Sequence, residues 1–337
     1  MIGYHAYFKY AEPHMPAWVH KRLEDLWRHF HAHHYLEALL PASLGSKLRR
    51  ASERRRTRLF LWRVKPLPTC LLGRRWPRSP NRVSMDITYS CNLKCYNCSR
   101  SCEQAPSNDC MSLEQVQHFL EESRASGVQW RRISVAGGEP TNHPQVVEIM
   151  NLILTYRARF FPKARVLLAT NGYGERVNRV LSLLPPGVRV LNSAKTTRVQ
   201  TRFQTFNVAP IDVEGYRGTD FSNACYVTWL CGLGVTPYGY YPCTLAGAID
   251  RTFGLDLGRK TLPKPDDPMI AELRTFCALC GFFKPWTGER LNGPVMSSTW
   301  VQAYARSRQN PPTLSRLAES PALVQMGVEQ GNSHCFL

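Results

Sequence analysis

The chain of 337 residues has no apolar run of about 18 residues, the length that a membrane-spanning helix needs. Residues 1–18 also lack the apolar core of a signal peptide, so we expect a cytoplasmic protein without a membrane span. Acidic residues are scarce, because 25 Asp and Glu stand against 43 Lys and Arg, for a formal net charge of +18. Residues 1–80 alone hold 16 Lys and Arg but only 5 Asp and Glu.

A basic surface favours anionic partners such as nucleotides, phosphorylated substrates, nucleic acid or acidic membranes, and it equally fits a simple role in solubility. A nucleic-acid interface would interleave aromatic and basic residues, and Trp62 and Trp76 are too sparse for that, so we do not expect nucleic acid as a partner. The 12 cysteines cluster at short spacings. In a chain without an export signal, such clusters indicate metal or cofactor ligation rather than disulfides.

The pattern of the sequence divides the chain into four parts. Residues 1–80 form a basic extension with an amphipathic helix predicted over residues 18–40, and prolines between residues 66 and 80 mark its end. Residues 81–220 alternate strand and helix signals. Residues 221–285 hold five cysteines, and residues 286–337 form a weakly patterned tail.

The alternation within the second part predicts an α/β fold. Five strands are expected, at residues 83–88, 132–136, 166–170, 188–191 and 203–208. Helices are expected from Ser112, with Gln115 completing a capping box, and at residues 144–156 and 175–184. Repeated strand–helix units indicate a parallel sheet with helices outside it, either open or rolled into a barrel. In a parallel barrel the chemistry lies at the C-terminal ends of the strands.

The first cysteine group follows directly after the first predicted strand. Cys91, Cys95 and Cys98 have a spacing that suits three of the four irons of a 4Fe–4S cluster, which leaves one iron open for a small molecule. Zinc in a closed site needs four ligands, and nearby Cys102 and Cys110 keep that alternative open. These two cysteines would otherwise be small buried hydrophobes or donors of a hydrogen atom.

With Gly137, Gly138, Glu139 and Pro140 after the second strand, the sequence resembles the radical S-adenosylmethionine (radical SAM) superfamily. The resemblance implies a partial (β/α)6 TIM-like barrel that binds S-adenosylmethionine and a 4Fe–4S cluster. It implies that the Gly-Gly-Glu-Pro segment contacts the methionine end of that cofactor. Glycines allow a close backbone approach, and Glu139 would either lie near the ammonium group or brace the loop.

Other cofactor contacts follow from the same resemblance. Asn171 lies in a polar turn after the third strand, and Asn192 and Ser193 follow the fourth, where such enzymes contact the ribose. Many members carry an aromatic residue just before the third cysteine. Here that residue is Asn97 and the aromatic residue is Tyr96, so both are candidates for the adenine contact.

A second cysteine group lies downstream. Residues 239–243 resemble the segment that opens the auxiliary-cluster domains, called SPASM or twitch, of this superfamily. We expect one auxiliary 4Fe–4S cluster in a small domain, with a β-hairpin over residues 231–243 and a loop that returns the last pair of cysteines. The expected ligands are Cys231, Cys243, Cys277 and Cys280, with Cys225 as the competitor of Cys231. The same four thiols would also suit structural zinc.

The resemblance implies an iron–sulfur oxidoreductase that takes electrons from a flavodoxin- or ferredoxin-type donor. Its first expected substrate is a peptide or protein, which would be crosslinked, epimerised or oxidised. The alternative is a small anionic metabolite, such as a nucleotide or sugar, that is oxidised or rearranged. A non-catalytic metal-binding module is the third hypothesis, and residues 137–140 argue against it because a structural metal site does not need them. No residue is assigned a catalytic role.

Overall fold

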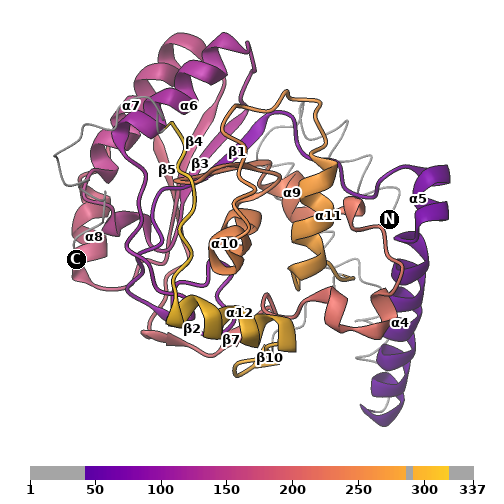
Figure 1. Cartoon of the computed structure of the whole chain (residues 1–337). Helices are drawn as coiled ribbons and strands as arrows, with labels where there is room; N and C mark the ends of the chain where they lie inside the picture. The colour runs from indigo at the N-terminus through magenta and orange to yellow at the C-terminus, as the bar shows by residue number, and fades with distance from the viewer. Residues whose placement is uncertain (1–41, 286–290, 319–337) are drawn as a thin grey trace. The chain divides into compact units, whose positions relative to one another are not determined.

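The expected alternation folds into a six-stranded, mostly parallel sheet in the computed structural model, which describes residues 42–285 and 291–318 (Figure 1). The helix expected at residues 18–40 lies outside these ranges. The strands of the sheet are β1 (Arg82–Asp86), β3 (Arg132–Ala136), β4 (Arg165–Thr170), β5 (Val188–Asn192), β8 (Leu233–Thr236) and β9 (Gly239–Tyr241). Their order is β5-β4-β3-β1-β8-β9, and β9 is the antiparallel one. The α/β class is therefore confirmed, whereas closure into a partial barrel stays a prediction.

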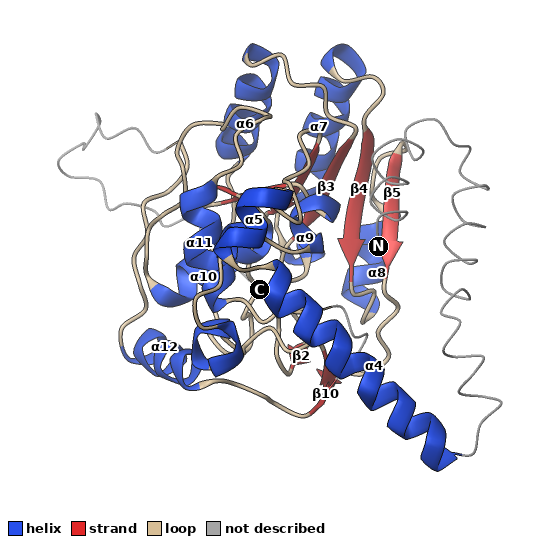
Figure 2. Ribbon diagram, turned by 90° about the vertical axis from the view of Figure 1, so that its right-hand side faces the viewer, coloured by secondary structure: helices blue, strands red, loops and turns tan. Residues whose placement is uncertain are grey.

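Helices between the strands cover one face of this sheet. They are α6 (Leu113–Ala125), α7 (Val146–Phe160) and α8 (Glu175–Ser182). The predicted capping box of α6 is confirmed, because the Ser112 hydroxyl accepts a hydrogen bond from the Gln115 backbone and the Gln115 side chain accepts one from the Ser112 backbone. Figure 2 shows β3, β4 and β5 side by side and pointing the same way.

The two faces of strand β1 bury different side chains. Val83 and Met85 pack into an apolar core with residues of β3, β4, α6 and α7. Ser84 and Asp86 alternate with them and are buried on the opposite face. A strand with both faces buried belongs in the middle of a covered sheet. Asp86, on the polar face of β1, is the last residue of this strand and precedes the loop that holds the first cysteines.

The fifth strand was predicted in the wrong place. Residues 204–208 form no strand, and only the short β7 (Arg202–Phe203) precedes them, paired with β10 (Leu291–Asn292). The apolar Phe206 instead packs against Trp300, with ring centroids 5.0 Å apart. The strand that follows next to β1 is β8, which pairs with it in parallel. The hairpin expected over residues 231–243 is confirmed as β8 and β9.

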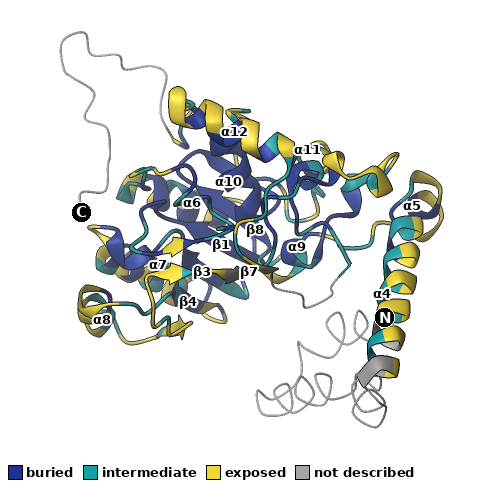
Figure 3. Cartoon of the chain, turned by 90° about the horizontal axis from the view of Figure 1, so that it is seen from below, coloured by how far each residue is buried: buried dark blue, intermediate teal, exposed yellow. Residues whose placement is uncertain are grey.

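The C-terminal half surrounds a second apolar core. It is built by α9 (Tyr226–Leu230), α10 (Thr244–Phe253), α11 (Ile270–Leu279) and α12 (Ser298–Gln309). Helix α10 is buried from Thr244 to Thr252, and Figure 3 shows it dark blue while α12 exposes one face. Because β8 and β9 belong to the main sheet, residues 221–285 share that sheet with residues 82–192.

A boundary between two compact units lies within residues 1–80, the extension expected from the sequence. The chain divides into the units Met1–Leu59 and Phe60–Leu337. The helix α4 (Ala42–Arg63) begins in the first unit and ends in the second, which also holds α5 (Pro66–Leu72). Phe60 and Val64 are buried in a cluster with Leu273 and Cys277 of α11. No described helix has the length and apolar character needed to cross a membrane.

Candidate active site and auxiliary cysteine site

The predicted cofactor motifs lie along one edge of the sheet, where four parallel strands end. The cysteine loop follows β1, and residues 137–140, 170–172 and 192–193 follow or end β3, β4 and β5. The loop after β3 is bonded to the chain just before Cys91. The Gly138 N–H donates to the Thr88 carbonyl at 2.7 Å, and the Glu139 N–H donates to the Ser90 carbonyl at 2.8 Å. The topology therefore brings distant motifs together.

Both glycines of the motif are required by this close packing. A Cβ atom on Gly137, whose φ is +148°, would stand 2.4 Å from the Thr88 carbonyl oxygen. On Gly138 it would stand 2.3 Å from the Ser90 carbonyl oxygen. Real Cβ atoms do not approach so closely, so any other residue would push the loop away from the cysteines. The close approach expected from the sequence is made to the chain's own backbone.

Glu139 is fully buried and braces two loops. Its carboxylate accepts hydrogen bonds from the Thr141 N–H (3.2 Å), the Thr141 hydroxyl (2.8 Å), the Thr170 hydroxyl (2.8 Å) and the Asn171 N–H (2.8 Å). The side chain thus ties the end of β4 to the turn after β3. These contacts agree with the bracing role, one of the two that the sequence allowed.

The turn after β4 also holds the cysteine loop. The Asn171 amide donates to the Asn92 side chain at 2.7 Å, and the Asn92 amide donates to the Tyr173 carbonyl at 2.8 Å. Next to it, the Ser193 N–H donates to the Thr170 carbonyl at 3.0 Å. The Asn192 side chain accepts from the Ala194 N–H at 2.7 Å and crowds Gly172. Asn171, Asn192 and Ser193 therefore lie on the same edge as the cysteine loop.

The three thiols of the first group lie near one another. Burial, together with the nearby Cys98 and Cys95 thiolates, raises the pKa of the Cys91 thiol to about 12. Burial and the Cys98 charge also raise the pKa of Cys95 to about 12. A hydrogen bond with Cys102 lowers the pKa of Cys98 and raises that of Cys102. Cys102 is buried against the group, and Cys110 is buried as well.

Tyr96 and Asn97 differ in what they contact. Asn97 is fully buried with a φ of +55°, and its side chain donates to the Gly293 carbonyl at 3.0 Å and accepts from the Val295 N–H at 2.9 Å. Its amide is therefore engaged with the segment before α12. Tyr96 is partly exposed, and its backbone N–H donates to the Gln200 carbonyl at 3.0 Å.

The sequence did not reveal a buried ion pair next to the first group. Asp86, the last residue of β1, is fully buried and accepts two hydrogen bonds from Arg100, at 3.1 and 3.2 Å. Burial lowers the pKa of Arg100, but Asp86 and the thiolates of Cys231 and Cys98 outweigh it and raise that pKa overall. An acidic residue on the polar face of a strand, followed by an arginine just past Cys98, is the signal that could have revealed this pair.

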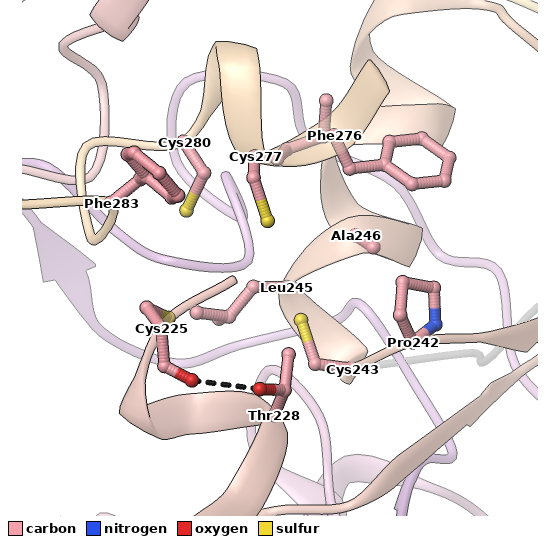
Figure 4. A pocket seen from close by; sticks show the side chains of 11 residues that line it. Cys225, Thr228, Pro242, Cys243, Leu245, Ala246, Phe276, Cys277, Cys280 and Phe283 are labelled. Carbon is pink, nitrogen blue, oxygen red and sulfur yellow. Dashed lines mark hydrogen bonds between the residues drawn. The ribbon is translucent and has the colours of Figure 1, made fainter. Parts of the chain in front are cut away.

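The second group of thiols gathers around a small cavity. Figure 4 shows Cys277 and Cys280 on one side of it, with Cys225 and Cys243 on the other. The remaining lining residues are Thr228, Pro242, Leu245, Ala246, Ile249, Phe276 and Phe283. Cys277 lies in the last turn of α11 and Cys280 follows that helix, so a helix presents this pair rather than the expected loop. Burial raises the pKa of all four thiols, that of Cys225 to about 11.

The structure favours Cys225 over Cys231 as the fourth member. Cys225 precedes α9 and lines the cavity, whereas Cys231 ends that helix and does not. Burial raises the pKa of the Cys231 thiol, and Arg100, Arg132, Asp86 and Arg82 act on it; Cys231 in turn acts on the pKa values of Cys225 and Cys243, so it lies near the group without lining the cavity. Cys225 is therefore the fourth thiol at this cavity, while Cys231 as a ligand stays a prediction from the sequence. Spacing alone could not choose, because both cysteines flank the five residues of one short helix.

Both cysteine groups offer thiol donors. All 11 cysteines in the described ranges are free thiols, so both groups can ligate. Over those same ranges, no three His, Cys, Asp or Glu side chains converge around a single ion. Iron–sulfur clusters are held by cysteine thiolates, so the donor type of both groups suits such clusters.

Comparison with known proteins agrees with the first of these sites. Residues 85–212 match the family model described as "Radical SAM superfamily". The chain carries a radical SAM domain. This domain contains Cys91, Cys95, Cys98 and residues 137–140.

The radical SAM relatives are named as enzymes, which confirms the predicted enzyme class. An "AdoMet-dependent heme synthase" from Methanosarcina barkeri is 32% identical over 97 residues, covering 28% of this chain and 25% of that protein. A "Probable GTP 3',8-cyclase" from Methanococcus maripaludis is 30% identical over 121 residues, covering 33% of this chain and 40% of that protein. The chain thus spans two fifths or less of the length of these relatives.

A solved structure also shows some likeness to this chain. It is titled "Crystal structure of BtrN in complex with AdoMet and 2-DOIA" and is 15% identical, covering 50% of this chain and 74% of that one. Its TM-score of 0.31 is too low to support an argument about the fold.

Proposed function

We propose that the chain is a radical SAM enzyme in which Cys91, Cys95 and Cys98 hold a 4Fe–4S cluster with one open iron for S-adenosylmethionine. The observation that carries this proposal is the direct bonding of the Gly137–Pro140 loop to the backbone that leads into Cys91. A motif for the cofactor and a motif for the cluster are thereby held at one edge of the sheet. That edge is where parallel α/β folds place their chemistry.

Held by Cys91, Cys95 and Cys98, a reduced cluster would supply the electron for reductive cleavage of S-adenosylmethionine, and with it the means to remove a hydrogen atom from the substrate. The chain's own residues orient the reactants and exclude water. Glu139 fixes the loop that would contact the methionine end. Asn171, Asn192 and Ser193 are the proposed contacts for the nucleoside end. Tyr96 is the proposed adenine contact, because the Asn97 amide is already engaged.

We further propose that Cys225, Cys243, Cys277 and Cys280 hold one auxiliary 4Fe–4S cluster in a twitch-like arrangement, next to a partial barrel. Support comes from the four buried thiols around one apolar cavity. Because burial raises the pKa of these thiols, they favour the neutral form unless iron binds, and binding of iron would release their protons. A reducing cytoplasm and a flavodoxin- or ferredoxin-type electron donor complete the proposal.

We propose two candidate classes of substrate. A peptide or protein is the first candidate, because auxiliary clusters accompany such chemistry in the superfamily that the sequence resembles. A small anionic metabolite is the second, favoured by the net charge of +18 and by the nucleotide in the name of the cyclase relative. Adding GTP or a pool of short peptides to the reduced enzyme separates them, since the true class of substrate should accelerate formation of 5′-deoxyadenosine.

Anaerobic reconstitution tests the proposed clusters. We expect about eight irons with matching sulfide per chain, four for each cluster, and 5′-deoxyadenosine under reduction. Replacing Cys91, Cys95 and Cys98 by alanine should abolish cofactor cleavage and leave about four irons. Cys70→Ala is the matched control, because this exposed cysteine belongs to neither group. Zinc as the sole metal, or cleavage that survives the triple replacement, would overturn the proposal.

A further inference from the structure

The side chain of Arg100 connects the two cysteine groups. Arg100 stands two residues after Cys98, and its guanidinium donates to the hydroxyl of Thr244 at 3.1 Å. Thr244 is fully buried and directly follows Cys243, which belongs to the second group. One partly buried side chain therefore bridges from the loop of the first group to the first residue of α10.

The guanidinium is held in place by a fixed opposite charge. The Arg100 guanidinium donates two hydrogen bonds to the Asp86 carboxylate, and none of the Asp86 side chain is exposed. Helix α10 also binds back to the same loop, because Arg251 donates to the Arg100 carbonyl at 2.7 Å and to the Ala105 carbonyl at 2.8 Å. The loop of the first group and α10 are thus joined at three points.

We infer that the Arg100–Asp86 pair is a positioning and charge-balancing element that sets the reduction potentials of both clusters. The inference rests on the proposed function, because it needs a cluster in each cysteine group. Arg100 stands two residues after Cys98 and donates to Thr244, which directly follows Cys243. Charges near a cluster and its solvent exposure are the levers by which a protein adjusts iron–sulfur potentials.

The sign of the effect follows from electrostatics. A cluster gains a negative charge on reduction, so a nearby cation stabilises the reduced form and a nearby anion destabilises it. Water screens the interaction only in part, because the Asp86 side chain is fully buried and that of Arg100 is 22% exposed. Removing the cation alone should lower both potentials, and removing the anion alone should raise them. Removing both leaves the net charge unchanged.

This reasoning defines a set of three variants with opposite outcomes. Arg100→Gln should lower the potentials of both clusters, and Asp86→Asn should raise them. We expect each shift to change the one-electron reduction equilibrium at least tenfold, which corresponds to about 59 mV. The double variant Arg100→Gln/Asp86→Asn should return close to the parent potentials. A general loosening of the fold would not give shifts of opposite sign.

The measurement is a redox titration of the anaerobically reconstituted full chain, followed by electron paramagnetic resonance. Each potential is assigned with a variant that keeps one cysteine group, Cys277→Ala/Cys280→Ala or Cys91→Ala/Cys95→Ala. Two loaded clusters whose potentials stay fixed, or move in the same direction in both single variants, would overturn the inference alone. A parent protein with iron for one cluster would overturn the auxiliary cluster, and the inference with it, before any potential is measured.

Discussion

Replacing Glu139 by alanine should destabilise the chain even when no cofactor is bound. The change deletes the acceptor of four hydrogen bonds in a fully buried place. The two hydroxyl donors can rotate, but the backbone N–H groups of Thr141 and Asn171 are left without an acceptor. Each orphaned donor costs about 1–3 kcal/mol, so the free energy of unfolding should fall by about 2–6 kcal/mol. That is a large part of the about 5–15 kcal/mol by which proteins are stable.

Urea unfolding of the reduced, cofactor-free chain, followed by circular dichroism, measures this loss. Glu139→Gln keeps the side-chain volume and one acceptor oxygen, so it should cost less than Glu139→Ala. Glu214→Gln is the control, because this carboxylate is exposed and surface changes stay within about 0.5 kcal/mol. If Glu139→Ala also stays within that range, the carboxylate is no brace and the role at the cofactor ammonium returns.

Three further predictions concern other parts of the structure. Gly138→Ala should lower the iron retained per chain after reconstitution, because its Cβ would overlap a backbone carbonyl; Gly215→Ala should not, since its nearest neighbour would be 3.4 Å away. Cys225→Ser should lose the iron of the auxiliary cluster while Cys231→Ser keeps it, as measured by iron and sulfide content; the reverse would restore the sequence preference. Burial lowers the pKa of His143, so the folded chain holds fewer protons there than the unfolded chain. The stability that this residue contributes is present above its ordinary pKa of about 6.5 and is lost as the pH falls below it. Unfolding free energies measured from pH 7 to pH 5 should therefore fall more steeply in the parent than in His143→Gln, and equal slopes would contradict the assignment.

The strands, and the motifs that follow them at one edge of the sheet, could be predicted because each is marked by a short local sequence pattern. Strand β3 was expected at residues 132–136 and lies there, and β4 and β5 differ from their predicted ranges by one residue at one end. Each of these strands is a short apolar run bounded by turn residues. The parallel arrangement then brings together motifs that lie up to 100 residues apart, so their meeting at one edge follows from topology alone.

Features that depend on three-dimensional packing could not be read in this way. The segment around Phe206 looks like a strand because it is apolar, but its partner is Trp300 of α12. The choice between Cys225 and Cys231 depends on which end of α9 faces the cavity. The Arg100–Asp86 pair joins a loop to a strand end, and no periodicity in the sequence reports such a contact.

Strand β8 has a consequence for how this protein could be divided or recombined. It lies between β1 and β9 in the main sheet, and the cysteines at residues 225 and 243 flank the hairpin that it forms. A truncated chain that stops before residue 221 would lack β8 and leave one edge of β1 unpaired. Unpaired strand edges promote aggregation. The second group of cysteines therefore does not belong to a domain that can be removed separately from the main sheet. Moving these cysteines into another protein would mean exchanging a strand of the main sheet, so the two cysteine groups should be engineered as one piece.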